Sequence, residues 1–155
     1  MKKVLFVLPP SGTSEEAIDF AVKRAKKDGV TLAALYLLEK GLASEISEKF
    51  TDIGFIGDKP STELSESIMK QQRQIGYEEL GRVQIKAMEE GVGFEPVMEH
   101  GVPLERVLSL IASMDIGTVI IVRKRQKAIF KYFSRSLADE VKEKASCEVV
   151  VIEEQ

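Results

Sequence analysis

The sequence predicts a doubly wound α/β fold of the Rossmann-like type: a five-stranded parallel sheet with helices on both faces. Five short apolar segments alternate along the chain with segments of helical periodicity. The apolar segments show little polar alternation, which is typical of parallel strands buried on both faces. Right-handed crossovers between such strands favour the doubly wound topology. The 155 residues suffice for one hydrophobic core, so we expect a single domain over residues 1–155.

The first three elements follow directly from the N-terminal pattern. Residues 3–8 form a short apolar run that ends at a Pro-Pro pair, which predicts a buried strand. Thr13 and Glu16 have the spacing of a capping box, and the helix that they begin ends near Gly29. Residues 30–38 are again apolar and predict the second strand.

The middle of the chain contains a long excursion and a long helix. Residues 39–60 hold three glycines and a proline around a short helical pattern at 43–50, and we interpret them as a surface excursion. Residues 61–90 predict a polar helix with a broad apolar stripe. Gly76 and Gly81 each weaken this helix by about 1 kcal/mol relative to alanine.

The last third of the chain repeats the alternation of strand and helix. Residues 92–98 predict the third strand, and Pro103 is placed as the first-turn proline of a helix that ends near Ser113. Residues 118–122 predict the fourth strand. Leu137, Val141 and Ala145 mark a final helical face, and residues 147–152 predict the fifth strand.

Composition excludes several classes of protein. No apolar run approaches the roughly 20 residues of a membrane helix, and no cleavage site follows the first apolar run, so we expect neither a membrane span nor a signal peptide. Cys147 is the only cysteine, which precludes an intrachain disulfide and fits the reducing cytoplasm. We therefore expect a cytoplasmic protein.

The charge is uneven along the chain. The formal net charge is -3, but residues 123–135 contain six bases and no acid, so this window carries +6 and the remainder -9. Such a narrow positive region on an acidic chain argues against nucleic-acid binding. The window either contacts an acidic protein or an anion, or it is a solvated basic loop whose aromatic side chains pack on the body of the domain.

Two loops are candidates for a binding site, because doubly wound sheets bind ligands outside the carboxyl ends of their strands. The loop 9–13 places Ser11 and Gly12 before a helix whose free N–H groups could hold an anion. Glu15 and Glu16 oppose an anion there, and no Gly-x-x-x-x-Gly-Lys-[Ser/Thr] motif is present. This loop is therefore either a phosphate cradle or an ordinary capped turn.

The second candidate loop follows the fourth strand. Arg123 and Arg125 could grip a phosphate or a carboxylate through their planar guanidinium groups. Elsewhere, candidate catalytic groups are sparse: His100 is the only histidine, so no multi-histidine metal site can form. We expect a turn role for His100, packing as a small hydrophobe for Cys147, and neither a metal nor an enzymatic activity.

Several segments resemble the universal stress protein family, in order and at the spacing of that family. They are the first strand, Ser14–Ala17, Gly101–Val107, Asp115–Val122 and Ala145–Ile152. The resemblance extends over nearly the whole chain. It implies a parallel sheet in the order 3-2-1-4-5, a homodimer, and a stress-response or regulatory function either with or without ATP binding.

The ATP-binding members of that family carry an Asp after the first strand and, after the fourth, Gly-x-x-Gly, nine residues and Gly-[Ser/Thr]. At the matching positions this sequence has Pro9, Val122, Arg125 and Arg135, and only Ser136 keeps the family type. Side chains in place of glycines prevent a close approach of the backbone to phosphates. We therefore predict no ATP binding in the family manner and no cofactor, with Arg123, Arg125 and Ser136 left to hold a different anion.

The final strand predicts self-association. Residues 147–152 would place a strand that is apolar on both faces at the edge of the sheet, where a second copy of the chain would cover it. The alternative function is that of a nucleotide- or flavin-phosphate-binding protein using the loops 9–13 and 123–136. A nucleotide hydrolase is less consistent with the sequence, because Pro9 and Arg123 occupy the two best positions for a metal-holding carboxylate.

Overall fold

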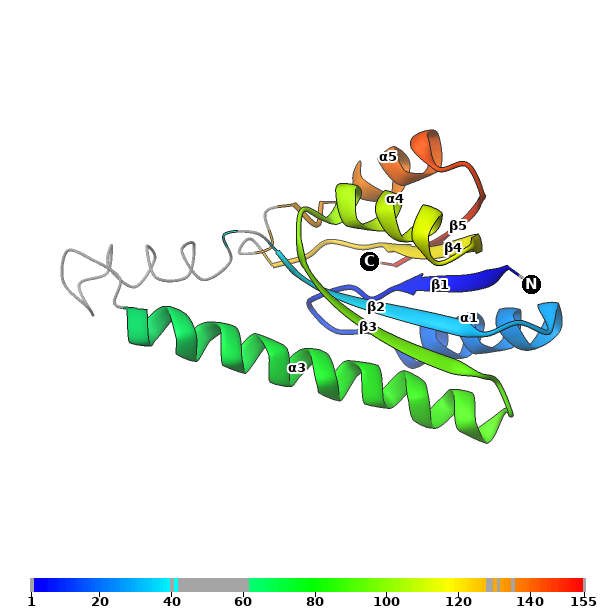
Figure 1. The fold of residues 1–155 in the computed structure, drawn as a ribbon, viewed down its shortest axis with the longest axis horizontal. Helices are drawn as coiled ribbons and strands as arrows, with labels where there is room; N and C mark the ends of the chain where they lie inside the picture. Colours follow the sequence, from blue (N-terminus) through cyan, green and yellow to red (C-terminus); the bar gives the residue numbers. More distant parts are fainter. Residues whose placement is uncertain are drawn as a thin grey trace.

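The computed structural model describes residues 2–39, 41, 62–127, 130, 132–134 and 136–154. One parallel sheet has the order β3-β2-β1-β4-β5, which confirms the predicted fold class and strand order (Figure 1). The predicted helix at 43–50 and nearly all of the excursion lie outside the described residues. The elements are β1 Lys3–Val7, α1 Glu15–Asp28, β2 Leu32–Glu39, α3 Thr62–Glu89, β3 Phe94–Gly101, α4 Pro103–Ser113, β4 Ile116–Arg123, α5 Ser136–Lys144 and β5 Glu148–Glu153.

The central strand, β1, organises the sheet because it pairs with β2 on one side and with β4 on the other. Phe6 is opposite Ala34 of β2 and Ile120 of β4, and all three residues are completely buried. Strands that are buried on both faces need apolar residues at every position, and this explains the unalternating runs in the sequence.

Successive residues of each strand supply two separate cores. One core lies under α1 and α3 and includes Phe6, Tyr36 and Val83. The other lies under α4 and α5 and includes Leu5 and Val107. Figure 1 shows these two pairs of helices on opposite faces of the sheet, and this is the doubly wound arrangement.

The start of α1 differs from the predicted capping box. Ser14, not Thr13, is the N-cap residue, and its hydroxyl accepts a 3.1 Å hydrogen bond from the N–H of Ala17. A capping box on Thr13 was therefore wrong by one residue. The predicted end is confirmed: Gly29 adopts φ 67° as the C-cap, a left-handed conformation that glycine adopts without a Cβ penalty.

The third strand begins two residues later than predicted, for a reason that lies at the end of α3. Gly91 has φ 69°, and the N–H of Val92 still bonds to the carbonyl of Ala87 at 2.8 Å. Val92 therefore belongs to the helix terminus and packs in the core rather than in β3. Within the part of the chain that the structure describes, no helix has both the length and the apolar character of a bilayer span.

Candidate functional site

The two loops predicted as binding segments are bonded directly to one another. The N–H of Ser11 donates to the side-chain oxygen of Gln126 at 3.1 Å, and the N–H of Lys127 donates to the Ser11 hydroxyl at 3.2 Å. The Lys124 ammonium donates to the carbonyl of Gly12 at 3.4 Å. The structure therefore brings Ser11 and Gly12 together with residues 124–127 at the carboxyl ends of β1 and β4. These hydrogen bonds occupy polar groups that would otherwise be available to a ligand.

A carboxylate from α3 occupies the next donor of the first loop. Glu79 accepts a 2.8 Å hydrogen bond from the N–H of Thr13. Arg82 holds this carboxylate at 2.9 Å and also reaches the carbonyl of Thr13 at 2.9 Å and Glu15 at 2.7 Å. The Glu79 carboxylate therefore occupies the place where an anion would bind. Arg82, on the same helix, neutralises its charge.

A second carboxylate comes from the residue that follows β5. The hydroxyl of Ser14 donates to Glu154 at 2.5 Å, and the other oxygen of Glu154 lies 4.0 Å from the Lys124 ammonium. The backbone N–H of Glu154 donates to the carbonyl of Arg123 at 3.0 Å, which extends the pairing of β4 and β5 by one bond. Glu154 thus joins the start of α1 to the loop after β4.

The candidate arginines have different environments. The guanidinium of Arg123 forms ion pairs with Asp139 of α5 and with Glu153, whose oxygen lies 3.4 Å from Nε. Arg125 is exposed and has no ion pair within the described residues. Of the two arginines predicted to hold an anion, Arg123 is therefore paired with carboxylates of the chain, and Arg125 is exposed to solvent. Arg135 lies outside the described residues.

Ser136 begins α5 and bonds locally. Its hydroxyl shares a 2.7 Å hydrogen bond with Ser134 and donates to Glu140 of the same helix at 3.4 Å. The hydroxyl of Ser136 therefore bonds only to neighbouring residues at the start of α5, among the described residues. The structure shows no contact of Ser136 with Ser11 or Gly12 in that part of the chain.

The aromatic residues of the basic window help to hold it on the domain. Phe130 and Phe133 are buried in the core beneath α4 and α5. The N–H of Tyr132 donates to Glu39 at 2.8 Å, and Glu39 is itself buried at the end of β2. For the two phenylalanines, the interpretation that aromatics pack on the body of the domain is therefore correct.

Tyr36 lies beneath the first loop and supports it. Its hydroxyl donates to the carbonyl of Pro10 at 3.4 Å. Burial, together with the nearby negative charge of Glu79, raises the pKa of Tyr36 to about 12. The phenol therefore remains neutral at physiological pH and can serve as a donor to the loop.

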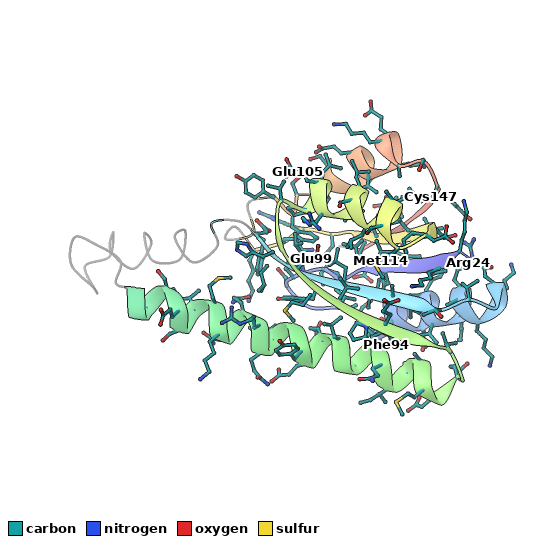
Figure 2. All side chains as sticks on the ribbon, viewed as in Figure 1. Arg24, Phe94, Glu99, Glu105, Met114 and Cys147 are labelled. Carbon is teal, nitrogen blue, oxygen red and sulfur yellow. The ribbon has the colours of Figure 1, made fainter. Side chains whose placement is uncertain are left out.

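Groups at the other end of the sheet form a separate surface. A hollow of about 520 Å³ lies against α1 and the start of β5, and is lined in part by Phe20 and by Arg24, whose position Figure 2 shows. Arg24 is bonded to Glu148 at 2.6 Å.

Cys147, beside Glu148, is half-buried, and burial raises the pKa of its thiol. Across the described ranges, no cluster of three potential metal ligands occurs.

Comparison with known proteins assigns the family. The family model of universal stress proteins matches residues 1–153. The chain belongs to the universal stress protein family. No curated protein sequence matches it.

Solved structures of universal stress proteins share the fold of this family member at low identity. UspA from Lactobacillus plantarum is 14% identical, with a TM-score of 0.72 and 97% of each chain covered. The Archaeoglobus fulgidus protein in complex with dAMP is 16% identical, with a TM-score of 0.62 and 98% of each chain covered. An Arabidopsis thaliana family member with AMP bound is 14% identical, with a TM-score of 0.60, and the match covers 100% of this chain and 93% of that one.

The structure describes three of the positions that the resemblance aligned with the family's ATP-site residues. Pro9 is buried at the end of β1 and has no N–H to donate. Val122, the second-to-last residue of β4, is half-buried and packs against the core beneath α1 and α3. Arg125 projects into solvent from the following loop. None of these positions offers the bare backbone of a glycine.

Sequence reasoning missed four residues that shape the candidate site: Glu39, Glu79, Gln126 and Glu154. Glu39 had a local signal, because it is an acid at the end of an apolar strand. The other three had none, since each meets its partner only through the fold. Glu79 lies 66 residues from Thr13, and Glu154 lies 140 residues from Ser14.

Proposed function

We propose that this universal stress protein is a non-catalytic regulatory or stress-response protein that does not bind ATP through the glycine cradle of its relatives. One observation carries the proposal: the backbone N–H groups of Ser11 and Thr13 and the hydroxyl of Ser14 are already bonded to groups of the chain itself. Ser11 is bonded to the loop after β4, Thr13 to Glu79, and Ser14 to Glu154. A phosphate would have to displace these contacts before it could bind.

The alternative is a nucleotide- or flavin-phosphate-binding protein that uses the loops 9–13 and 123–136. Two of the similar structures are described as complexes, one with dAMP and one with AMP. Arg125, within the second of these loops, is exposed and could contact such a ligand. Both proteins are below 20% identical to this chain, however, and their likeness supports the fold rather than the ligand.

Calorimetric titration distinguishes the two functions. We expect purified protein to give no saturable heat with ATP, AMP or inorganic phosphate. Side chains stand at the positions that the resemblance assigns to the cradle, and the N–H groups of Ser11 and Thr13 already have partners. Flavin mononucleotide belongs in the same series, and a yellow colour of the purified protein would already favour the flavin alternative. Micromolar binding of ATP by the wild-type chain would overturn the proposed function.

The exposed bases of the loop after β4 support an acidic protein or an anion as partner. Arg125 and Lys127 are exposed and have no ion pair within the described residues. In contrast, Arg123 and Lys124 face carboxylates of the chain itself. Free bases on a protein of net negative charge would steer an acidic partner to this loop.

We also propose that two copies of the chain associate through β5. This strand forms one edge of the sheet, and its four central residues, Val149–Ile152, are only half-buried. An edge strand with apolar side chains on both faces is a template for pairing with another chain. Pairing would satisfy its outward backbone groups and cover the partly exposed apolar side chains.

Light scattering tests this dimer. We expect the wild-type protein to have twice the 17.2 kDa mass of one chain, and we expect Val151→Lys to reduce it to a monomer because a charge would enter the apolar interface. Val97→Lys is the matched control, since Val97 is also half-buried but lies on β3 at the opposite edge. A monomeric wild type, or equal effects of the two variants, would contradict pairing through β5.

A further inference from the structure

Three large apolar side chains are exposed along the outer face of α3. Tyr77 is 59% exposed, Ile85 is 61% exposed and Met88 is 70% exposed. Their spacing places them on one stripe of the helix that is about 80° wide. Single exposed apolar residues are ordinary on a protein surface, whereas a contiguous group of them marks an interaction site. The stripe therefore has the character of a contact surface.

The stripe belongs to a longer line of uncharged residues, which we call the α3 seam. The seam residues are Gln74, Tyr77, Gly81, Gln84 and Met88, with Ile85 beside them. They follow one another at intervals of three, four, three and four residues, which is the spacing of the contact positions of two packed helices. The charged residues of α3 all lie off this line. The pattern therefore indicates a second helix as the partner of the seam.

Gly81 lies at the centre of the seam, although packing within the chain does not require a glycine there. A Cβ at position 81 would meet no atom within 4 Å, and glycine is less favourable than alanine inside a helix. The missing side chain lets the backbone of another helix approach closely. A helix packed against the seam from outside would therefore use this glycine.

A second copy of α3 fits the seam, because the seam is symmetric about Gly81. Gln74 and Met88 lie seven residues from this glycine in opposite directions. Tyr77 and Ile85 lie four residues from it, again in opposite directions. A twofold axis at Gly81 would pair two antiparallel helices, with Tyr77 of each copy level with Ile85 of the other. Apolar side chains would then cover one another on both sides of the axis.

Charges beyond the two ends of the seam are complementary in this antiparallel arrangement. Lys70 and Arg73 are exposed and have no ion pair within the described residues. Glu89 is 60% exposed, and its nearest cation, Lys86, lies 4.0 Å away. Arg73 and Glu89 lie eight residues from Gly81 in opposite directions, so the twofold axis brings the basic end of each helix to the acidic end of the other. A parallel pair would instead place like charges together.

We propose that the α3 seam is a self-association surface on which a second copy of the chain packs its own α3, antiparallel and centred on Gly81. This surface goes beyond the proposed function and does not depend on it. Figure 1 shows α3 and β5 on opposite sides of the domain, so the contact through α3 and the contact through β5 do not compete. A chain that uses both contacts forms assemblies larger than a dimer.

The α3 contact is weaker than a standard interface. One helix face supplies far fewer than the roughly 20–30 residues a side of a stable protein–protein interface. We therefore expect the contact to form at chain concentrations of about 0.1–1 mM. At micromolar concentrations the β5 dimer is the expected species, and larger assemblies appear as the concentration rises.

Sedimentation velocity in a Val151→Lys background tests the seam without the contact through β5. We expect the mass of this variant to rise from one chain toward two between about 10 µM and about 1 mM, and Gly81→Arg in the same background to remain monomeric. The added charge would meet its own copy at the twofold axis. The open space at position 81 and the good helix propensity of arginine preserve the fold, which circular dichroism checks. Gln71→Arg is the matched control, because Gln71 is exposed on the same helix but lies off the seam.

Disulfide cross-linking tests the geometry of the pair. In a Cys147→Ser background, Gly81→Cys should form a disulfide-linked dimer when copper phenanthroline is added as the oxidant, because the two copies of position 81 meet at the axis. Gln71→Cys should not, since the two copies of position 71 are separated by about 30 Å along the helix pair.

Equal self-association of the Gly81→Arg and Gln71→Arg variants, or equal cross-linking at positions 81 and 71, would overturn the α3 contact. The contact through β5 is judged separately. If Val151→Lys leaves the mass at micromolar concentration unchanged, pairing through β5 fails, and the comparison of Gly81→Arg with Gln71→Arg still decides the role of the seam.

Discussion

Replacement of Phe133 by alanine is expected to lower the free energy of unfolding by about 3–5 kcal/mol, the range for large buried aromatic residues. Phe133 is 6% exposed and packs in the core beneath α4 and α5, although it lies in the basic window after β4. Its loss leaves a cavity and releases one anchor of that window. Urea unfolding followed by circular dichroism measures the change.

Phe20→Ala is the control for this prediction, because it makes the same chemical change at a side chain that is 43% exposed on α1. We expect Phe20→Ala to cost at least about 2 kcal/mol less than Phe133→Ala, since less apolar surface is lost from the interior. Similar costs at the two positions would mean that the window does not pack on the domain as the structure describes.

Alanine at the two glycines of α3 is expected to change stability in opposite directions. A Cβ at position 76 would lie 2.6 Å from Cδ1 of Tyr36 and 2.7 Å from the terminal methyl of Met98. The Met98 side chain can move, but the Tyr36 ring is 1% exposed and closely packed. Gly76→Ala should therefore cost about 1–3 kcal/mol through overpacking.

Gly81→Ala is the matched variant on the same helix. A Cβ at position 81 meets no atom within 4 Å, and the backbone there is helical. Alanine should therefore stabilise the protein by up to about 1 kcal/mol through its higher helix propensity. Thermal unfolding of both variants tests the pair, and stabilisation by Gly76→Ala would show that α3 does not approach β2 as closely as described.

The proposed regulatory function has a physical basis in the polar contacts at one end of the sheet. Polar groups at the carboxyl ends of β1 and β4 need partners, and in this chain Glu79, Glu154 and Gln126 supply them. A site satisfied from within binds an external anion only when an internal partner is displaced. An external anion at this end of the sheet would therefore have to compete with the chain's own carboxylates.

The sequence predicted the fold because its signals are local. The run at residues 3–8 is apolar at every position, which is the pattern of a strand buried on both faces. Gly29 and Pro103 mark a helix end and a helix start, since each imposes its own backbone conformation. The capping box failed because Ser14 and Thr13 are equally suitable as caps, and only packing chose between them.

The sequence by itself determined the α/β alternation and the family. The absence of the family's glycines and Asp at positions 9, 122, 125 and 135 stays a prediction from the resemblance. Only the tertiary structure decided which side chains bond to the loop after β1. Glu79 and Glu154 carry no local sign that they bond to Thr13 and Ser14, because these contacts span 66 and 140 residues. These contacts exist because the carboxyl ends of β1, β4 and β5 lie at the same end of the parallel sheet, beside the middle of α3.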